Sequence, residues 1–451
     1  MEQPKSIPDM EARTPWSSHQ GFKQVSISPP QQKIAGTIRV SGSKSLTNRA
    51  LILAAMAEGT SRISGILRSD DVYWCIENLR SLGISITVEG ETAIVDGCGG
   101  NWPVKEGELY VGAAGTVARF LPGALAAGHG SWTFKGSKRM EERPIAPLLT
   151  ALMNQGAYIS YLNQEHAYPF VLEASGLKGG TVEIAGDQSS QFVSGLLLAA
   201  PYARQPITLK LQGSTVQKEY VNMTIELMRA FGIEVEEGGG SYTIPIGNYA
   251  ARSIELEPDI STSCYFWAVA ALTGGHIRTE GIDAARTRQP DIEMLGVLEQ
   301  MGCTVSRGEG YVEVEGAAQL RGGFEISMER WSDQTLTMAV LALYADAPIT
   351  LKDAAHIRHH ECDRISAICT ELRRLQVNVE EHHDGLTVYP GAPVPAVLDS
   401  YDDHRMAMAL SLIGLRVDGI TILDPGCVSK TCPDYFERLR GLGVYSISIS
   451  P

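Results

Sequence analysis

The side chains best suited to chemistry occur in short polar motifs that precede or open apolar, Ala-rich helices. Lys44 and Arg49 lie in GSKSLTNRA, and Arg143 lies in KRMEERPI. A helix start presents unpaired N–H groups and a partial positive charge, so it favours anions. Cations placed at several such starts would together bind a small ligand that carries phosphate and carboxylate groups.

Uncharged polar groups recur at the same positions. GDQSSQF supplies the hydroxyls of Ser189 and Ser190 and the amide of Gln191, which can hold phosphate without a net charge. GAAGTVARF contains Gly115 and Thr116, and glycine lets a backbone approach a ligand closely. Helix capping or a plain turn explains any one of these residues. Their recurrence along the chain favours a common binding site.

Two carboxylates could transfer protons. Asp333 lies in WSDQTLT and Glu361 lies in HIRHHECDRI, so one could act as a base and the other as an acid. Arg358 and Arg364 flank Glu361 and could bind anions through paired hydrogen bonds. An exposed or ion-paired position would explain either carboxylate alone.

The last motifs add His404 and Arg405 in YDDHRMAMAL and Lys430 in DPGCVSKTCPDYF. No Gly-x-x-x-x-Gly-Lys-Ser/Thr loop is present, so the sequence predicts no ATP site. The formal net charge is −14, which argues against nucleic acid as a partner. The basic residues are therefore interpreted as a local site for small anions.

The motifs open six similar units, so internal repeats organise the chain. Each unit is predicted to contain an Ala-rich helix that is apolar on most faces, a strand, a second helix with one apolar face, and in most cases a hairpin. The first helices begin about 70 residues apart, near Ser45, Gly115, Ser189, Thr262, Asp333 and His404.

An open stack of repeats would leave apolar faces of the first helices exposed. We therefore predict an α/β protein with two inside-out domains, each of three βαβαββ-type units around buried helices. Residues 42–257 form the first domain, and residues 28–41 plus 258–451 form the second. Residues 1–27 are expected to be a flexible leader. The active site is expected in the cleft between the domains.

Composition limits the remaining possibilities. None of the eight cysteines forms a C-x-x-C pair, so buried thiols are expected rather than a zinc site. No apolar run approaches the roughly 20 residues of a membrane helix. The polar, partly acidic start resembles neither a signal peptide nor a transit peptide. We expect a cytoplasmic monomer with no membrane partner.

The motifs GSKSLTNRA, GTVAR, RMEERPI, SSQF, ECDRI, YDDHRMAM and SKTCPDYF together resemble the enolpyruvyl transferase family. The resemblance covers about residues 30–448. It implies two domains that close on substrate, with no metal and no organic cofactor. It also implies addition of an acceptor hydroxyl to phosphoenolpyruvate and elimination of phosphate through a tetrahedral intermediate. Shikimate 3-phosphate is the expected acceptor.

The resemblance also implies roles for individual residues. The expected catalytic residues are Lys44, Asp333, Glu361, Lys430 and His404. The expected substrate-binding residues are Lys44, Ser45, Arg49, Gly115, Thr116, Arg119, Arg143, Ser189, Ser190, Gln191, Gln217, Tyr220, Asp333, His356, His360, Arg364, Arg405 and Lys430.

Three positions depart from the family pattern. Gln217 replaces a usual Ser or Arg, His360 replaces a usual Lys, and Ala113 replaces a usual Asn. Gln217 and His360 fall on the side that would hold the phosphate of the acceptor, and neither supplies a permanent cation. Compensated variation explains this pattern. The alternative is a paralogue whose acceptor is a nucleotide or a cyclic alcohol of secondary metabolism.

Overall fold

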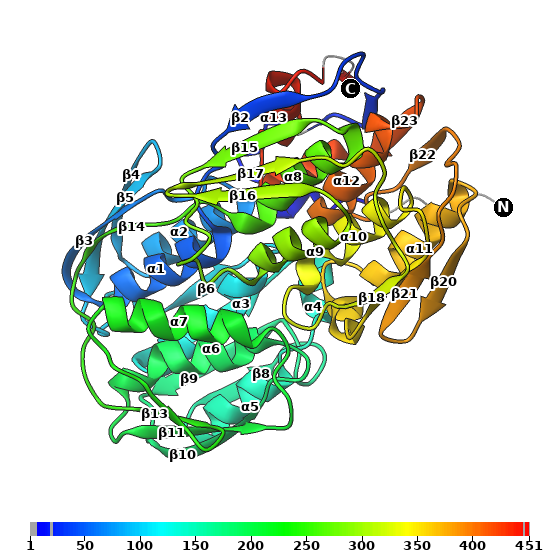
Figure 1. Cartoon of the computed structure of the whole chain (residues 1–451). Helices are drawn as coiled ribbons and strands as arrows, with labels where there is room; N and C mark the ends of the chain where they lie inside the picture. The colour runs from blue at the N-terminus through cyan, green and yellow to red at the C-terminus, as the bar shows by residue number, and fades with distance from the viewer. Residues whose placement is uncertain (1–6, 19–20, 445–446, 451) are drawn as a thin grey trace. The chain divides into compact units, whose positions relative to one another are not determined.

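The computed structural model describes the chain except for residues 1–6, 19–20, 445–446 and 451 (Figure 1). The chain divides into two compact units, Met1–Val40 with Glu257–Pro451, and Ser41–Leu256. The sequence placed the crossings near residues 41–44 and 256–260. Six four-stranded sheets are present in the described ranges, three in each unit.

The unit of residues 41–256 contains the first three repeats. Its sheets have the orders β14-β3-β5-β4, β6-β7-β9-β8 and β10-β11-β13-β12. The strands are β3 (Glu58–Ser64), β4 (Ser85–Glu89), β5 (Thr92–Cys98), β6 (Glu106–Tyr110), β7 (His129–Lys135), β8 (Tyr158–Tyr161), β9 (Phe170–Ser175), β10 (Gly180–Ala185), β11 (Ile207–Gln212), β12 (Glu236–Gly238), β13 (Ser241–Ile244) and β14 (Ser253–Glu255).

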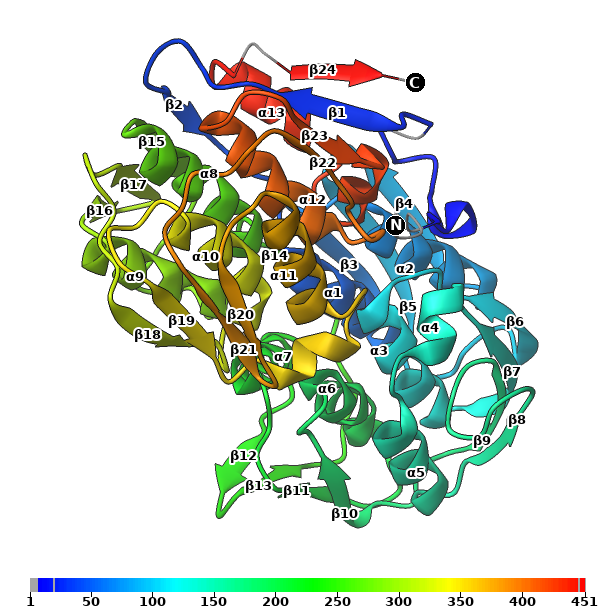
Figure 2. The same ribbon diagram turned by 90° about the vertical axis from the view of Figure 1, so that its right-hand side faces the viewer.

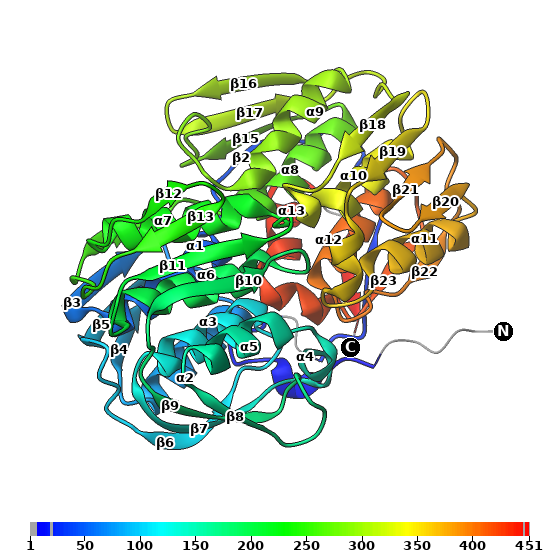
Figure 3. The ribbon, with the colours of Figure 1, turned by 90° about the horizontal axis from the view of Figure 1, so that it is seen from below.

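The helices of this unit are of two kinds. The inner helices are α1 (Lys44–Met56), α3 (Gly115–Ala126) and α6 (Ser190–Ala199). Figure 3 shows α3 and α6 next to each other, and every residue of α3 is buried. The remaining helices are α2 (Asp70–Ser81), α4 (Lys138–Glu142), α5 (Ala146–Asn154), η2 (Ala200–Tyr202) and α7 (Lys218–Ala230).

The other unit repeats this plan with the orders β16-β17-β15-β2, β18-β19-β21-β20 and β22-β23-β1-β24. Its strands are β1 (Gln24–Ile27), β2 (Ala35–Ile38), β15 (His276–Glu280), β16 (Thr304–Gly308), β17 (Tyr311–Glu315), β18 (Phe324–Ser327), β19 (Ile349–Lys352), β20 (Val379–His382), β21 (Gly385–Val388), β22 (Ala396–Leu398), β23 (Ile420–Leu423) and β24 (Ile447–Ser450).

The inner helices of this unit are α8 (Ile260–Thr273), α10 (Thr335–Ala342) and α12 (His404–Ser411), and every residue of α10 is buried. The others are η1 (Met10–Ala12), η3 (Pro290–Glu293), α9 (Met294–Gln300), η4 (Ser332–Gln334), η5 (Ala355–His359), α11 (Arg364–Arg374), η6 (Leu412–Leu415), η7 (Pro425–Lys430) and α13 (Tyr435–Gly441). The predicted fold class, helices inside and sheets outside, is confirmed by the structure and by the solved structures compared below.

The expectation of a flexible leader over residues 1–27 is wrong for its described part. β1 pairs antiparallel with both β23 and β24, so the start of the chain completes the sixth sheet (Figure 2). The Arg13 side chain is buried and ion-paired. The prediction failed because these partners lie about 400 residues away, where local composition gives no signal. Residues 1–6 and 19–20 lie outside the described residues.

Two other expectations concern thiols and membranes. All eight cysteines are free, and six of them are buried, as predicted. Within the described ranges, none of the helices combines the length and apolar character needed to span a bilayer.

A close contact between two glycines sets the distance between α3 and α6. A Cβ added at Gly195 would lie 2.3 Å from the carbonyl oxygen of Arg119, and one at Gly123 would lie 2.2 Å from that of Gly195. Pro122 lacks the N–H that Ala118 would accept in a regular helix, and the Tyr168 hydroxyl donates to that carbonyl at 2.8 Å instead. α3 and α6 are thereby held in close backbone contact at Gly123 and Gly195.

We expect Gly195→Ala to lower the free energy of unfolding by about 1–3 kcal/mol, because the two helix backbones must separate to accommodate a methyl group. Thermal and urea unfolding would measure this. Gly238→Ala is the control, since a Cβ there meets nothing within 4 Å. Equal effects of the two substitutions would contradict the proposed packing constraint.

Candidate active site

The first turn of α1 holds Lys44, which its sequence motif singled out. Lys44 Nζ lies 3.3 Å from Asp71 Oδ2, and the Asp71 side chain is only 2% exposed. Asp71 belongs to the first turn of α2, so a short ion pair joins the starts of two helices. Sequence reasoning missed Asp71, because an acidic residue in a first helical turn is ordinary.

Arg49 is buried one turn further along α1. Its Nε donates to Thr224 Oγ1 at 2.7 Å, and its terminal nitrogens donate to the carbonyls of Ser45 (2.9 Å) and Tyr220 (3.1 Å). Its Cζ also lies 4.8 Å from the ring centroid of Phe120. Burial lowers the pKa of Arg49 to about 10. All three nitrogens donate to protein oxygens, so Arg49 connects α1 to α7 and fixes their relative positions.

The start of α3 is tied to α1 and to the loop after α4. Asn48 Nδ2 donates to Thr116 Oγ1 at 2.7 Å. A Cβ on Gly115 would lie 3.0 Å from Nη1 of Arg143 and 3.1 Å from its Nη2. The missing side chain at Gly115 is therefore what lets the Arg143 guanidinium lie against the helix start. Gly115, Thr116 and Arg143 lie together as predicted.

Arg119 takes a supporting position. Its Nη2 donates to the carbonyl of Pro144 at 2.7 Å, directly after Arg143 in the chain, and the residue is 2% exposed. The described contacts of Arg119 fix the loop that carries Arg143. Ligand contact by Arg119 stays a prediction.

Polar groups of the third repeat lie at two helix starts. Ser189 caps α6 by accepting from the Gln191 N–H at 3.2 Å, and Ser190 is buried. Gln217 precedes α7 with left-handed backbone angles, φ 50° and ψ 46°. Tyr220 links this loop to Arg49 through its carbonyl.

In the other unit, Arg364 at the start of α11 connects the predicted catalytic carboxylates. It donates to Asp333 Oδ1 at 3.0 Å, to Glu361 Oε2 at 2.8 Å and to Asp403 Oδ2 at 2.8 Å. Burial disfavours its charge, but Asp403, Glu361 and Asp333 outweigh that cost and raise the pKa of Arg364. One cation thus holds both the candidate base and the candidate acid.

Asp333 lies between two arginines. Its second oxygen accepts from Arg405 Nη2 at 2.8 Å, and Arg405 also lies 3.5 Å from the Tyr265 hydroxyl. Asp403 caps α12 through the Arg405 N–H at 2.9 Å while it binds Arg364. Sequence reasoning missed Asp403, although an Asp directly before a helix is a recognisable cap signal.

Glu361 lies between Arg364 and Lys430, whose Nζ is 3.7 Å from Glu361 Oε1. Lys430 is 6% exposed. His404 is also buried, with Nδ1 3.5 Å from Asp403 Oδ1. The structure therefore brings five predicted groups into one cluster: Asp333, Glu361, Arg364, Arg405 and Lys430. His404 lies next to Asp403, which binds Arg364.

Two histidines near this cluster are held neutral. His356 Nε2 lies 2.7 Å from Ser332 Oγ, and burial lowers the pKa of His356 to about 4. His360 Nδ1 lies 3.0 Å from Arg364 Nη1 and must accept its hydrogen bond. Desolvation and Arg364 hold the pKa of His360 well below its usual range. Neither histidine supplies the cation that the family pattern places at His360.

Two residues depart from the sequence interpretation. Arg358 does not join the cluster but forms ion pairs with Asp363 (2.9 Å) and Glu381 (3.1 Å) on the protein surface. Asp291 was missed and is fully buried, where it accepts a hydrogen bond from Gln334 beside Asp333. Burial raises the pKa of Asp291 to about 7, and the nearby charge of Asp333 adds to the shift.

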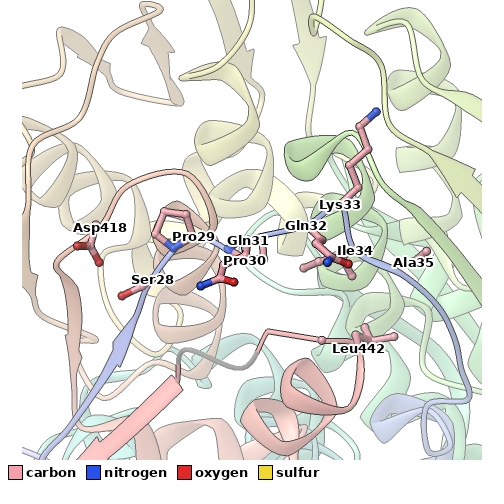
Figure 4. A pocket seen from close by; sticks show the side chains of 11 residues that line it. Ser28, Pro29, Pro30, Gln31, Gln32, Lys33, Ile34, Ala35, Asp418 and Leu442 are labelled. Atoms are coloured by element: carbon pink, nitrogen blue, oxygen red, sulfur yellow. The ribbon is translucent and has the colours of Figure 1, made fainter.

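A separate hollow of about 960 Å³ lies beside the connection from β1 to β2. Figure 4 shows its lining, which includes Pro29, Gln31, Lys33, Asp418 and Leu442. None of the predicted site residues lines it. Within the described part of the chain, no group of three or more His, Cys, Asp or Glu side chains is placed to hold a metal ion.

Comparison with known proteins identifies the family of this chain. The profile of the EPSP synthase (3-phosphoshikimate 1-carboxyvinyltransferase) family matches residues 29–439. The chain belongs to this family. It is 52% identical over 441 residues to 3-phosphoshikimate 1-carboxyvinyltransferase 2 of Halalkalibacterium halodurans, covering 97% of this chain and 98% of the relative. The predicted resemblance is thus confirmed, and the chain is a transferase.

Two further proteins of the EPSP synthase family also match nearly the whole chain. The Nostoc punctiforme 3-phosphoshikimate 1-carboxyvinyltransferase is 42% identical, covering 92% of this chain and 98% of the relative. The solved EPSP synthase of Acinetobacter baumannii superposes with a TM-score of 0.80 at 26% identity, covering 95% of this chain and all of that chain.

The neutral state of His356 predicts a pH effect on stability. Because its pKa falls from 6.5 to about 4 on folding, the unfolded chain takes up the proton first, and stability is lost as pH falls from 6.5 towards 4. His356→Gln removes this loss. We expect the difference in free energy of unfolding between wild type and His356→Gln to decrease by roughly 3 kcal/mol as the pH is lowered from 7 to 4.

Urea unfolding of both proteins across this pH range measures the difference. His383→Gln is the control, because His383 is an exposed residue of the same unit and its replacement removes a histidine without affecting the core. A destabilisation by His356→Gln that stays constant with pH would contradict the neutral, buried state of His356.

Proposed function

We propose that the chain transfers the enolpyruvyl group of phosphoenolpyruvate to the 5-hydroxyl of shikimate 3-phosphate and releases phosphate. The observation that carries this proposal is the pair Asp333 and Glu361, joined by Arg364 in a chain of the EPSP synthase family. The relatives that are 52% and 42% identical both bear the name of this activity. A different acceptor is therefore not favoured.

Phosphoenolpyruvate carries a phosphate and a carboxylate, so its site needs several cations. We assign this role to Lys44, Arg143, Arg364, Arg405 and Lys430, with the amide of Gln191 and the backbone at Gly115 and Thr116. Arginine binds both anionic groups through paired, directional hydrogen bonds. Asp333 pairs with both Arg364 and Arg405, and Glu361 pairs with Arg364, so the carboxylates orient these two cations.

The addition step needs one proton removed and one delivered. Asp333 accepts the proton of the acceptor hydroxyl as the new C–O bond forms at C2 of phosphoenolpyruvate. Glu361 delivers a proton to C3, which gives the tetrahedral intermediate. When the substrate anions share Arg364 and Lys430, the Glu361 carboxylate is stabilised less as an anion and more readily carries that proton. Each transfer is typically worth about 10²–10⁴ in rate.

Elimination reverses the proton transfer at carbon. The bond from C2 to the phosphate oxygen breaks and C3 returns its proton to Glu361. Inorganic phosphate leaves with the proton that Asp333 took from the acceptor hydroxyl, so both carboxylates regain their starting state. Lys44 and Lys430 stabilise the charge that develops on the reacting oxygens and the leaving phosphate. His404 supports the cluster from its buried position. Neither a metal nor an organic cofactor takes part in the proposed steps.

We assign the acceptor to Ser45, Ser189, Ser190, Tyr220 and Asp333. Gln217 is an uncharged amide, and the lowered pKa of His356 and of His360 keeps both rings neutral. We therefore assign these three residues binding by hydrogen bonds rather than by charge. Arg49 and Arg119 act through the elements they brace. The reaction requires groups from both units to reach one pair of substrates, so the cleft predicted from sequence remains part of the proposal. We propose a cytoplasmic monomer.

The deciding experiment mixes the purified chain with phosphoenolpyruvate and shikimate 3-phosphate and measures phosphate release. We expect release that requires both substrates and is accompanied by 5-enolpyruvylshikimate 3-phosphate in the product mixture. Phosphoenolpyruvate binding without release would refute shikimate 3-phosphate as acceptor and direct attention to Gln217 and His360.

Asp333→Asn tests the base. We expect phosphate release to fall by about 10²–10⁴, since an amide cannot accept the hydroxyl proton. Phosphoenolpyruvate binding should not weaken, because the variant loses a carboxylate that competes for Arg364 and Arg405. Isothermal titration measures binding, and Asp346→Asn in an exposed loop is the control. Turnover near that of wild type would exclude Asp333 as the base.

A further inference from the structure

The segment before β1 contributes one buried cation to the unit that carries Asp333. The Arg13 side chain is 5% exposed, and a single terminal nitrogen lies 2.5 Å from Asp402 Oδ1 and 2.7 Å from Asp424 Oδ2. The two carboxylates come from different loops. Arg13 therefore joins the start of the chain to two segments about 400 residues away.

Each of these loops leads directly into a predicted site residue. Asp402 precedes Asp403, the cap of α12, whose second residue is Arg405. Asp424 precedes η7, which ends at Lys430. Arg405 binds the candidate base and Lys430 lies beside the candidate acid. A shift of either loop would therefore move a cation assigned to phosphoenolpyruvate.

Both carboxylates occupy backbone conformations that need support. Asp402 has φ 52° and Asp424 has φ 48°, in the left-handed region that side-chain-bearing residues rarely adopt. Such conformations persist where surrounding contacts over-determine them, and they cluster at functional sites. Arg13 supplies a contact to both residues at once.

The electrostatics make Arg13 difficult to replace. Burial raises the pKa of Asp424 to about 6, with Arg13 opposing the shift and Asp402 adding to it. Burial alone would lower the pKa of Arg13, but Asp424 and Asp402 outweigh it and raise that pKa. Without the guanidinium, two neighbouring carboxylates would repel each other in a partly buried setting.

Neighbouring contacts fasten the same segment. The Asp9 N–H donates to Asp402 Oδ2 at 3.0 Å, while the Asp9 side chain caps η1. The Ser18 hydroxyl donates to the carbonyl of Pro433, just beyond η7. Thr14 is 1% exposed. The segment is thus held at several points against the loops that it bridges.

We propose that Arg13 is a positioning residue that fixes Arg405 and Lys430 for phosphoenolpyruvate by bridging Asp402 and Asp424. The proposal rests on the proposed function for its kinetic consequence. Arg13 lies before residue 29, where the match to the EPSP synthase family begins. The bridge therefore starts from a segment outside the residues that the family profile matches.

The test compares wild type, Arg13→Gln and the control Arg286→Gln in the full chain. Arg286 is 87% exposed and pairs with Asp283 at 3.5 Å in the same unit, so its loss should leave activity and exchange unchanged. For Arg13→Gln we expect KM for phosphoenolpyruvate to rise about 3–30-fold, with KM for shikimate 3-phosphate unchanged and little loss of kcat.

Hydrogen–deuterium exchange of the unliganded proteins gives a readout that is independent of turnover. Amides of residues 400–405 and 424–430 should exchange about tenfold faster in Arg13→Gln, while those of α8 and α10 stay protected. Unchanged exchange in these loops would overturn the proposal. Faster exchange throughout the unit, with both KM values raised alike, would also overturn it, because that pattern reflects general destabilisation.

A second, conservative variant keeps the proposal testable if Arg13→Gln folds poorly. Arg13→Lys keeps the charge but presents one compact ammonium in place of the planar guanidinium. We expect the same local pattern at smaller amplitude, and behaviour identical to wild type would refute a bridging role. If wild type itself releases no phosphate, the proposed reaction fails, while the exchange comparison still decides whether Arg13 fixes the two loops.

Discussion

The buried guanidinium of Arg364 is the interaction on which the cluster around Asp333 depends. Three carboxylates converge on it: a candidate base, a candidate acid and the cap of α12. None of the three would be stable as a buried anion alone, and the cation would not be stable without them. The helix starts of the fifth and sixth repeats are therefore coupled by charge compensation, and one side chain holds both Asp333 and Glu361.

The unit of residues 41–256 stabilises its buried cations in a different way. Arg49 is held by hydroxyl and carbonyl oxygens and the face of Phe120, and its lowered pKa of about 10 still leaves it charged at neutral pH. Charge in this unit is compensated by dipoles around Arg49 and by Asp71 at Lys44. Arg49 therefore adds positive charge to this unit, and positive charge favours anionic ligands. Repeats of one architecture thus provide an ion-paired cluster in one unit and a dipole-lined one in the other.

Local pattern predicted much of this arrangement. The apolar helices became the inner helices, and Lys44, Gly115, Ser189, Asp333 and Arg405 lie at helix starts as expected. Contacts with distant partners were not predicted. Arg49 donates to oxygens of the third repeat, and Arg358 pairs with Glu381 across a loop that its motif does not contain. Asp403 and Asp291 look like ordinary helix-start residues until the fold places them beside Arg364 and Asp333.

The sixth sheet takes its last two strands from opposite ends of the chain, since β1 lies between β23 and β24. During synthesis, residues 41–256 form a continuous segment that can complete its three sheets as soon as it leaves the ribosome. The other unit must keep β1 unpaired until more than 390 further residues have been made, because among the described strands β1 has no ladder partner before β23. The two units are similar in architecture but differ in contact order. The unit with the higher contact order is expected to fold more slowly, and it is the one that contains Asp333 and Glu361.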